Sequence, residues 1–573
     1  MPRVLVHDGR FRVECDPWEH DMVRTVPGAR FSARGDVEPH WTVPLTWTSA
    51  VVLRNVFGRS LVASPEAMDW YKAERSRIDR VLALRDDLSA VSNFSDASEA
   101  FPWVAAGTRW ALEQGSGLEL TPVGGGKTVE FALAMRSRRG PHLVVTTPSM
   151  VRTWGRELER WWPGVDVSLV VGNIAARRKA LEAGHDVYVI HWHLLPKHSR
   201  LAPYGSCRLE RCTDCGGSRK PQSCERHPKE LNRPWGMVIA DEVHNAKRPT
   251  GKWTRALWAV GASAQWRWGL TATPIDKRPD EFWSLLRFAL PEEWPDHSRY
   301  VDRWCDTTWN GYGVQIDGLK DRTRGEFDRV TNHAWRRVPR DVVRQGRPES
   351  EVQVRLIDMS PKQRRQYDQM RKGRVTSGLT AGQIVAMNPM SQIGRLYQLA
   401  SASMDGAGDP RMVAPSNKVD VLQEIMEEAG GEPIVVFAQH RQLLMLAEAS
   451  LPEGSWASIH GGVTGELRDH ALQRFQDGKV PVLLCQYQSG GEGLTLTRSH
   501  IMVTLQESWS ALTMTQACGR VDRPGQAKPV QVIHLRSEGT LDEAVPRVYE
   551  KKAAWLQELV KDDLAVERLM ELA

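Results

Sequence analysis

Apolar residues gather along this chain in short runs that alternate with segments of helical periodicity. Between residues 96 and 345 the clearest runs are HLVVTTP, VDVSLVVG, HDVYVIHW, WGMVIADE and QWRWGLTAT. Short apolar strands that alternate with helices are typical of a parallel sheet with helices on both faces. The pattern therefore predicts an α/β fold for this part of the chain.

The same alternation returns after residue 346. The second set of predicted strands is PIVVFAQ, WASIHGG, VPVLLCQY, HIMVTLQE and VQVIHL, and the tail LDEAVPRVYEKKAAWLQELV predicts an amphipathic helix. Two α/β units of similar rhythm predict two lobes with a cleft between them.

The N-terminal residues follow a different pattern. VLVHDGRFRV predicts a hairpin with an Asp-Gly turn, and TSAVVLRNVFG predicts a helix that ends at Gly58. A charged helix and a polar linker follow. We predict a small N-terminal α+β domain, a first lobe with a cysteine-rich insertion and a helical protrusion, and a second lobe with a C-terminal helix. Their predicted bounds are 1–95 for the N-terminal domain, 96–345 for the first lobe, 203–230 for the insertion, 276–340 for the protrusion and 346–573 for the second lobe.

Composition narrows the class of protein. The hydrophobic content of 41% suffices for packed cores, and no apolar run approaches the ~20 residues that span a bilayer. The start MPRVLVHDGRFRVECDPWEH lacks an apolar signal core. Eight cysteines are too few for a disulfide framework. A net charge of +6 permits a nucleic-acid partner. We expect a soluble protein of a bacterial or phage-infected cytoplasm, without a membrane partner.

A glycine-rich stretch, TPVGGGKTVEFALAM, begins at Thr121. Backbone N–H groups of three consecutive glycines at a helix start can converge on phosphate oxygens. Lys127 would then reach the β- and γ-phosphates, and the Thr128 hydroxyl would ligate Mg²⁺. The strict pattern asks for glycine where this chain has Thr121, and a plain glycine turn before a helix is the alternative. The predicted phosphate-binding glycines are Gly124, Gly125 and Gly126.

An acidic pair ends a later predicted strand, MVIADEVHNAK. Asp241 is placed to hold Mg²⁺ through water, and Glu242 to polarise an attacking water. A solvated acidic turn is the alternative. The small hydroxyl residues of GLTATPI, between Thr271 and Pro274, could couple such a site to a neighbouring surface.

The second lobe carries SGGEGLTLT followed by QACGRVDRPGQ. Gln516, Arg520 and Arg523 are spaced four and three residues apart, so they share one face if the segment is helical. Arginines presented across a cleft can offset the charge that develops in phosphoryl transfer. An exposed basic helix is the alternative.

The motifs GGGKT, DEVH, TATP, SGGEGLTLT and QACGRVDRPGQ, in this order, resemble the core of helicase superfamily two, and the last resembles its Swi/Snf branch. The resemblance implies two tandem RecA-like lobes and an ATP- and Mg²⁺-dependent motor that tracks along duplex DNA without extended strand separation. It assigns to the ATPase site Lys127, Thr128, Asp241, Glu242, Gln516, Arg520 and Arg523. It also implies that the loop of Gly493 senses nucleotide and DNA together.

The chain departs from this family pattern at several positions. Val104, in FPWVAAGTRWAL, stands where a glutamine is expected, which puts adenine selectivity in doubt. Ser510 and Ala511 replace an Asn-Pro pair after Trp509. The N-terminal GARFSARGDVEPHWTVPL resembles the small domain that precedes the motor in annealing-helicase-type members.

The insertion CRLERCTDCGGSRKPQSCERH offers two short-spaced ligand pairs. Cys212 and Cys215 with Cys224 and His227 fit a closed tetrahedral Zn²⁺ knuckle of a structural kind. Cys207 could replace one ligand or stay free. Loosely placed thiols in a loop are the alternative.

Taken together, the sequence predicts a DNA-dependent ATPase with helicase-like lobes and sequence-tolerant binding to duplex or branched DNA. The alternatives are a nucleic-acid-binding scaffold with a degenerate ATP site, a strand-separating DNA helicase, and an RNA helicase.

Overall fold

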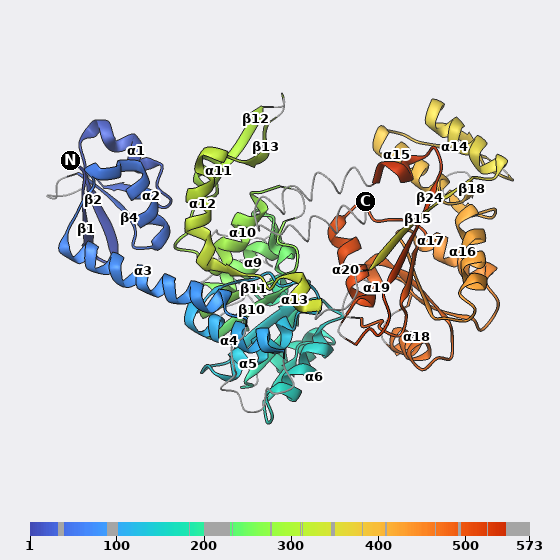
Figure 1. The fold of residues 1–573 in the computed structure, drawn as a ribbon, viewed down its shortest axis with the longest axis horizontal. Coiled ribbons are helices and arrows are strands. Elements are labelled where there is room, and N and C mark those ends of the chain that lie inside the picture. The colour runs from blue at the N-terminus through green and yellow to red at the C-terminus, as the bar shows by residue number, and fades with distance from the viewer. Residues whose placement is uncertain are drawn as a thin grey trace. The chain divides into compact units, whose positions relative to one another are not determined.

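The fold is that of a computed structural model, which falls into two compact units, Met1–Pro339 and Arg340–Ala573 (Figure 1). The structure describes residues 1–32, 39–88, 101–182, 184–199, 230–231, 233–275, 278–309, 311, 313–344, 350–380, 382–406, 410–463, 466–490, 494–523 and 525–545. The insertion with Cys207, Cys212, Cys215, Cys224 and His227, the residue Gly493 and most of the predicted C-terminal helix lie outside these ranges. Predictions that concern them stay predictions.

The first unit begins with a five-stranded sheet in the order β3-β4-β2-β1-β5. The β1/β2 hairpin predicted from the Asp-Gly signal is confirmed, since Asp8 and Gly9 both adopt positive φ, as such a turn requires. The strands are β1 (Arg3–His7), β2 (Arg10–Glu14), β3 (Arg30–Ser32), β4 (His40–Pro44) and β5 (Val62–Ala63).

Three helices accompany this sheet: α1 (His20–Arg24), α2 (Trp47–Phe57) and α3 (Pro65–Asp86). The Ser64 hydroxyl accepts the Ala67 N–H at the start of α3, and Pro65 occupies the first helical position, where its missing N–H costs nothing. At 22 residues, α3 is about 33 Å long and leads from the N-terminal sheet to α4 (Figure 1).

Side-chain hydrogen bonds join α2 to the segment 293–329, which comes late in the sequence of the first unit. Asn55 Nδ2 donates to Glu326 Oε2 at 2.6 Å, and the same carboxylate accepts from Arg303 and from the Trp304 indole. Trp47 Nε1 donates to the Arg329 carbonyl at 3.0 Å, and Thr48 Oγ1 donates to Glu293 Oε2 at 2.6 Å. The N-terminal sheet is therefore held against the body of its unit by polar contacts that are largely buried.

The body of the first unit is a seven-stranded parallel sheet in the order β14-β6-β11-β10-β7-β9-β8. Its central strands are buried along their whole length, which explains their nearly continuous apolar sequences. The strands are β6 (Gly117–Glu119), β7 (His142–Thr146), β8 (Val167–Leu169), β9 (Val187–His191), β10 (Trp235–Asp241), β11 (Ala264–Leu270) and β14 (Trp335–Arg336). The helices are α4 (Pro102–Gln114), α5 (Lys127–Arg136), α6 (Val151–Trp161), α7 (Ile174–Glu182), α8 (Leu195–His198) and α9 (Lys252–Gly261).

The segment 276–340, predicted to be helical, is only partly so. It contains α10 (Glu281–Ala289), α11 (His297–Trp304) and α12 (Arg324–Thr331), but also an antiparallel hairpin of β12 (Cys305–Trp309) and β13 (Val314–Leu319). Its end returns to the main sheet as β14, paired with β6. Threonine, valine and isoleucine favour strands in this hairpin, and the prediction overlooked that preference.

The second unit is built on a six-stranded parallel sheet in the order β15-β24-β23-β20-β22-β21. Its strands are β15 (Glu351–Ile357), β20 (Ile434–Ala438), β21 (Trp456–Ile459), β22 (Val482–Gln486), β23 (Ile501–Thr504) and β24 (Gln531–Ser537), and two small hairpins add β16 (Val375–Ser377), β17 (Gln383–Val385), β18 (Ser403–Asp405) and β19 (Arg411–Val413). The helices are α13 (Arg340–Arg344), α14 (Pro361–Gly373), α15 (Pro389–Leu399), α16 (Asn417–Glu428), α17 (Arg441–Ser450), α18 (Glu466–Gln476), α19 (Tyr487–Gly490) and α20 (Ala511–Val521). Two parallel-sheet units agree with the predicted α/β class.

Among the described helices of both units, none is long and apolar enough to cross a lipid bilayer.

Candidate functional site

The candidate site lies at the carboxyl ends of three neighbouring strands of the first unit. In the sheet, β11 pairs with β6 on one side and with β10 on the other. The glycine-rich loop follows β6, Asp241 ends β10, and Thr271 follows β11 directly. Because parallel strands present their carboxyl ends at one edge, three motifs separated in sequence meet there, at the edge where α/β sheets bind ligands.

The glycine-rich loop enters α5 with a conformation that only glycine adopts readily. Gly124 and Gly126 have φ of 82° and 84°, and Gly126 is the residue before the first turn of α5. A Cβ on Gly125 would lie 2.2 Å from Cγ2 of Thr121, and one on Gly126 would lie 2.6 Å from Cγ2 of Val104. The loop therefore leaves no room for side chains at Gly125 and Gly126, and its N–H groups stand at a helix N-terminus, which suits an anion.

Thr121 departs from the strict phosphate-loop pattern for a structural reason. Its hydroxyl donates to the Glu119 carboxylate and accepts the Val338 N–H at 3.0 Å, and its own N–H donates to Glu119 Oε1 at 3.1 Å. The side chain is buried below the loop. The threonine is therefore tied to β6 and to the segment after β14 by its own hydrogen bonds.

Lys127 begins α5, and its ammonium group lies on the loop. Nζ donates to the carbonyls of Thr121 at 2.5 Å and Pro122 at 3.1 Å. Burial lowers the pKa of Lys127, while the carboxylates of Glu242, Glu119 and Asp241 act in the opposite sense. A partly buried cation at the edge of the loop is a suitable partner for a phosphate.

Asp241 is held rigidly at the end of β10. Its Oδ2 accepts the Thr146 hydroxyl at 2.7 Å and the Trp154 indole N–H at 2.9 Å, and Trp192 Nε1 donates to its carbonyl at 3.0 Å. Burial and the neighbouring Glu242 raise the pKa of the Asp241 carboxyl group. A buried, oriented carboxylate beside a second one fits a divalent cation, because the cation offsets the cost of two close negative charges.

Glu242 adopts the left-handed conformation, with φ of 52°, which turns the chain sharply after the strand. His244 Nδ1 lies 3.2 Å from Glu242 Oε2 and 3.0 Å from the Thr271 hydroxyl. Thr271 Oγ1 also accepts the Thr273 N–H at 3.1 Å. One histidine thus contacts both the acidic pair and the small hydroxyl motif that the sequence singled out separately.

The segment expected to read adenine packs against the phosphate loop. Val104 is buried, with Cγ2 over Gly126. Its neighbour Trp103 donates an indole N–H to the Gly125 carbonyl at 2.9 Å. Both residues of α4 therefore support the loop from its side.

Sequence reasoning missed several residues that hold this site. Thr146 and Trp154 fix Asp241, and Glu119 fixes Thr121. Thr146 ends the apolar strand β7, Trp154 lies in the amphipathic helix α6 and Glu119 ends the short strand β6, and none of these gave a separate signal. Arg336 and Arg337 were assigned only to a helical protrusion. Arg337 donates to the Ala272 carbonyl at 3.3 Å and acts to lower the pKa of Lys127, which it approaches closely enough to repel.

In the second unit, Gln516 and Arg520 lie on α20, one helical turn apart, with Arg520 buried. The predicted shared helical face does not extend to Arg523, because α20 ends at Val521. Pro524 follows in the sequence and disfavours a helical conformation for the residue before it. Arg523 instead donates to the Gly519 carbonyl at 2.7 Å and to Thr495 Oγ1 at 2.9 Å.

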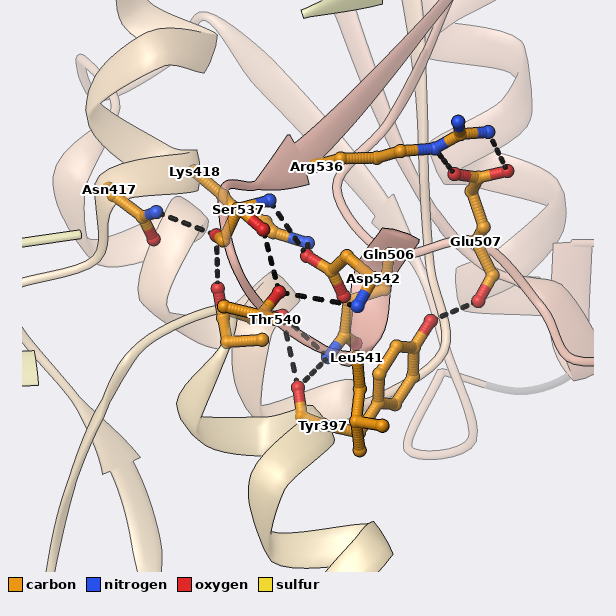
Figure 2. A network of polar contacts seen from close by, with 12 residues as sticks. Tyr397, Asn417, Lys418, Gln506, Glu507, Arg536, Ser537, Thr540, Leu541 and Asp542 are labelled. Atoms are coloured by element: carbon orange, nitrogen blue, oxygen red, sulfur yellow. Dashed lines mark hydrogen bonds and ion pairs between the residues drawn. The ribbon is translucent and has the colours of Figure 1, made fainter. Parts of the chain in front are cut away.

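A buried polar network fixes the segment that leads into α20 (Figure 2). Arg536 donates to Glu507 through Nε at 2.6 Å and Nη2 at 3.2 Å, and the Tyr397 hydroxyl donates to the Glu507 carbonyl. Ser510 then caps α20 by accepting the Thr513 N–H. The serine that replaces the expected asparagine therefore serves as a helix N-cap.

The same figure shows a second ion pair in the network. Lys418 Nζ lies 2.6 Å from Asp542 Oδ2, with both side chains buried, and Asn417 donates to the Ser537 hydroxyl at 2.8 Å (Figure 2). These contacts join the start of α16 to the end of β24 and to the helical turn 541–544 that follows it.

The structure thus brings together Lys127, Asp241, Glu242 and Thr271 at one sheet edge, and places Gln516 and Arg520 on one helix of the other unit. In the described residues, no group of three or more His, Cys, Asp or Glu side chains forms a metal cluster, and the predicted zinc ligands lie outside those residues.

A parallel sheet that feeds a glycine-rich loop into a helix, with an acidic pair at the end of a strand in the same sheet, defines a P-loop-type nucleotide-binding fold. Within that class, the chain belongs to the SNF2-related family. The SNF2-related domain matches residues 61–403, and the helicase conserved C-terminal domain matches residues 417–525.

Individual relatives agree with this family. The human SWI/SNF-related matrix-associated actin-dependent regulator of chromatin subfamily A member 1 is 24% identical over 77% of this chain and 41% of its own length. The putative ATP-dependent helicase/translocase YwqA of Bacillus subtilis is 24% identical over 82% of this chain and 50% of its own length. The chain therefore spans half or less of these curated relatives. The Sulfolobus solfataricus SWI2/SNF2 ATPase core, solved in complex with double-stranded DNA, is 20% identical over 82% of this chain and 96% of that chain, with a TM-score of 0.37.

Proposed function

We propose that this protein is an ATP-driven motor that moves along or remodels duplex or branched DNA. The observation that carries the proposal is the convergence of Lys127, the Asp241–Glu242 pair and Thr271 at the carboxyl ends of three adjacent strands. Membership of the SNF2-related family and the name of the Bacillus subtilis relative, a putative ATP-dependent helicase/translocase, support a motor driven by ATP.

In this proposal each residue of the first unit has a defined task. The N–H groups of Gly124, Gly125 and Gly126 and the Lys127 ammonium bind the phosphates of ATP. Thr128 and Asp241 hold Mg²⁺, which when bound offsets negative charge on the phosphate oxygens.

Glu242 then orients the attacking water and accepts its proton. His244 contacts both Glu242 and Thr271, so it is placed to relay a change at the acidic pair to the segment after β11.

The tasks proposed for the second unit rest on the family resemblance. Arg520 and Arg523 offset charge on the transferred phosphoryl group, Gln516 assists them, and the loop of Gly493 responds to nucleotide and DNA. The buried contacts around Glu507 support this proposal, because they fix the entry to the helix that carries Arg520. A structural Zn²⁺ held by the four predicted ligands of the insertion completes it.

The test is ATP hydrolysis measured without nucleic acid and with duplex DNA, branched DNA, single-stranded DNA and RNA. We expect the strongest stimulation by duplex or branched DNA, and loss of activity in Lys127→Ala. The matched control is Lys247→Ala, outside the phosphate loop. Hydrolysis at background with every nucleic acid would refute the motor, and stimulation by RNA alone would favour an RNA helicase.

A further inference from the structure

The phosphate loop rests on a buried charged cluster that the proposed reaction does not use. Arg336 is fully buried in the edge strand β14, and its Nη1 lies 3.3 Å from Glu130 Oε2 and 3.5 Å from Glu119 Oε2. Its Nη2 donates to the Trp103 carbonyl at 2.7 Å. One guanidinium therefore contacts β6, α4 and α5, the three elements that surround the loop.

The cluster places two carboxyl groups on one cation. Burial and the adjacent Glu119 raise the pKa of Glu130 well above its usual value, whereas the Arg336 cation acts in the opposite sense. Both carboxyl groups face the Arg336 guanidinium in a site closed to solvent. Such a cluster is stable when complete and costly when one member is removed.

Each member of the cluster leads to a different part of the loop. Glu119 holds both the N–H and the hydroxyl of Thr121 at the start of the loop. Trp103 holds the Gly125 carbonyl in its middle. Glu130 lies on α5, one turn after Lys127, and its N–H donates to the Gly126 carbonyl. The loop is thus supported at its start, its middle and its end.

Thr121 is the point where these supports meet. Its hydroxyl donates to Glu119 and also accepts from Val338, two residues after Arg336. Its methyl group fills the space that a side chain on Gly125 would need, and its carbonyl accepts from Lys127. Neither glycine, which the strict pattern asks for, nor valine could make both hydroxyl contacts.

We propose that Thr121, Glu119 and Arg336 act as positioning residues. The Thr121 hydroxyl connects segment 335–338 and the buried cluster to the phosphate loop, and so fixes the loop in the conformation that binds the triphosphate. This inference rests on the proposed function, since it concerns the same nucleotide site. All three side chains are buried beneath the loop, so each acts through the loop backbone.

The decisive comparison uses two substitutions that separate the methyl group of Thr121 from its hydroxyl. Thr121→Val keeps the methyl group and removes both hydroxyl contacts, whereas Thr121→Ser keeps the hydroxyl. We expect Thr121→Val to raise the KM for ATP and the Kd for a fluorescent mant-ADP probe about tenfold, with kcat far less affected. The conservative Thr121→Ser should rescue both values to within about twofold of the wild type.

Unfolding in urea provides the structural control. A merely structural role would lower the stability of Thr121→Val without changing the nucleotide affinity of its folded fraction. A valine variant that binds nucleotide as tightly as the wild type would overturn the proposal, and so would a serine variant that binds as weakly as the valine variant.

A third variant tests the cluster without removing a hydrogen bond. A Cβ on Gly107, in α4, would lie 2.3 Å from Glu130 Oε2 and 2.4 Å from Arg336 Nη1. Gly107→Ala should therefore displace the cluster and weaken mant-ADP binding in the same sense as Thr121→Val. A folded Gly107→Ala chain with wild-type affinity would contradict the proposal, and if that variant fails to fold, the Thr121 pair decides.

The two proposals fail in different ways. A wild-type chain that binds mant-ADP but never hydrolyses ATP refutes the motor, while the Kd comparison still decides the role of Thr121. A wild-type chain that binds no nucleotide overturns both.

Discussion

The close approach of Thr121 and Gly125 makes the phosphate loop sensitive to one added methyl group. In Gly125→Ala the new Cβ would lie 2.2 Å from Thr121 Cγ2, whereas carbon atoms normally approach to about 3.5–4.0 Å. Gly125 has no positive φ, so the backbone itself accepts alanine. Relieving the overlap must shift the loop, and overpacking of this kind costs about 1–3 kcal/mol.

That cost should appear in ATP affinity, because the loop conformation is what binds the phosphates. We expect the Kd for ATP to rise by roughly 5- to 150-fold in Gly125→Ala, the equivalent of 1–3 kcal/mol. Adding Thr121→Ser removes Cγ2 and leaves the Pro122 carbonyl, at 3.1 Å, as the nearest group. The double variant should therefore recover most of the lost affinity.

The assay is a double-mutant cycle on Kd, measured by equilibrium fluorescence with a labelled ATP analogue. Urea unfolding of all four proteins separates loss of fold from loss of affinity. If the double variant binds as weakly as Gly125→Ala alone, the contact does not shape the loop and the reasoning is refuted.

Three further predictions concern other parts of the chain. Burial lowers the pKa of His142 to about 4, and its Nδ1 accepts the Met237 N–H, so its contribution to stability is complete above pH 6.5 and is lost as the pH falls through 4. His142→Asn keeps a hydrogen-bond acceptor that does not titrate. In this variant the decrease in unfolding free energy between pH 7 and 4, measured in urea, should be smaller than in the wild type by roughly 3 kcal/mol. The same decrease in both proteins would contradict the lowered pKa. Lys418→Met leaves the buried Asp542 without its cation, so chemical denaturation should show the second unit destabilised by about 3–5 kcal/mol. The double variant Lys418→Met/Asp542→Leu should recover part of that stability. A solvated pair would instead give no destabilisation in Lys418→Met. Elemental analysis should find about one zinc per chain, released when thiols are titrated with a mercurial, and a metal-free preparation of active protein would end the zinc hypothesis.

Local patterns predicted the elements of this fold well. Asp8–Gly9 gave the hairpin turn, and buried runs such as that of β10 gave the parallel strands with the acidic pair at one end. These features depend on neighbours within a few residues, which is the range that periodicity and turn chemistry report.

Contacts between distant residues were not predictable in the same way. Glu119 and Arg336 are 217 residues apart, each lies in a short strand, and charged residues ordinarily indicate a surface. Nothing in either local sequence points to the other. Thr121 was interpreted as a departure from the phosphate-loop motif for the same reason, because its role depends on a contact with the distant residue Val338. Arg523 was misplaced for a local reason, because the proline after it was not weighed against the helical spacing.

The docking of α2 has a practical consequence for anyone who shortens this chain. The SNF2-related match starts at residue 61, a natural place to cut. Removing what precedes it would deprive Glu293 of the Thr48 hydroxyl and Glu326 of the Asn55 amide. It would also uncover the rings of Trp70 and Tyr71, which pack on Phe11 and Trp47. A fragment trimmed at that homology limit should be prone to aggregation, so failure to purify it would say nothing about the motor itself.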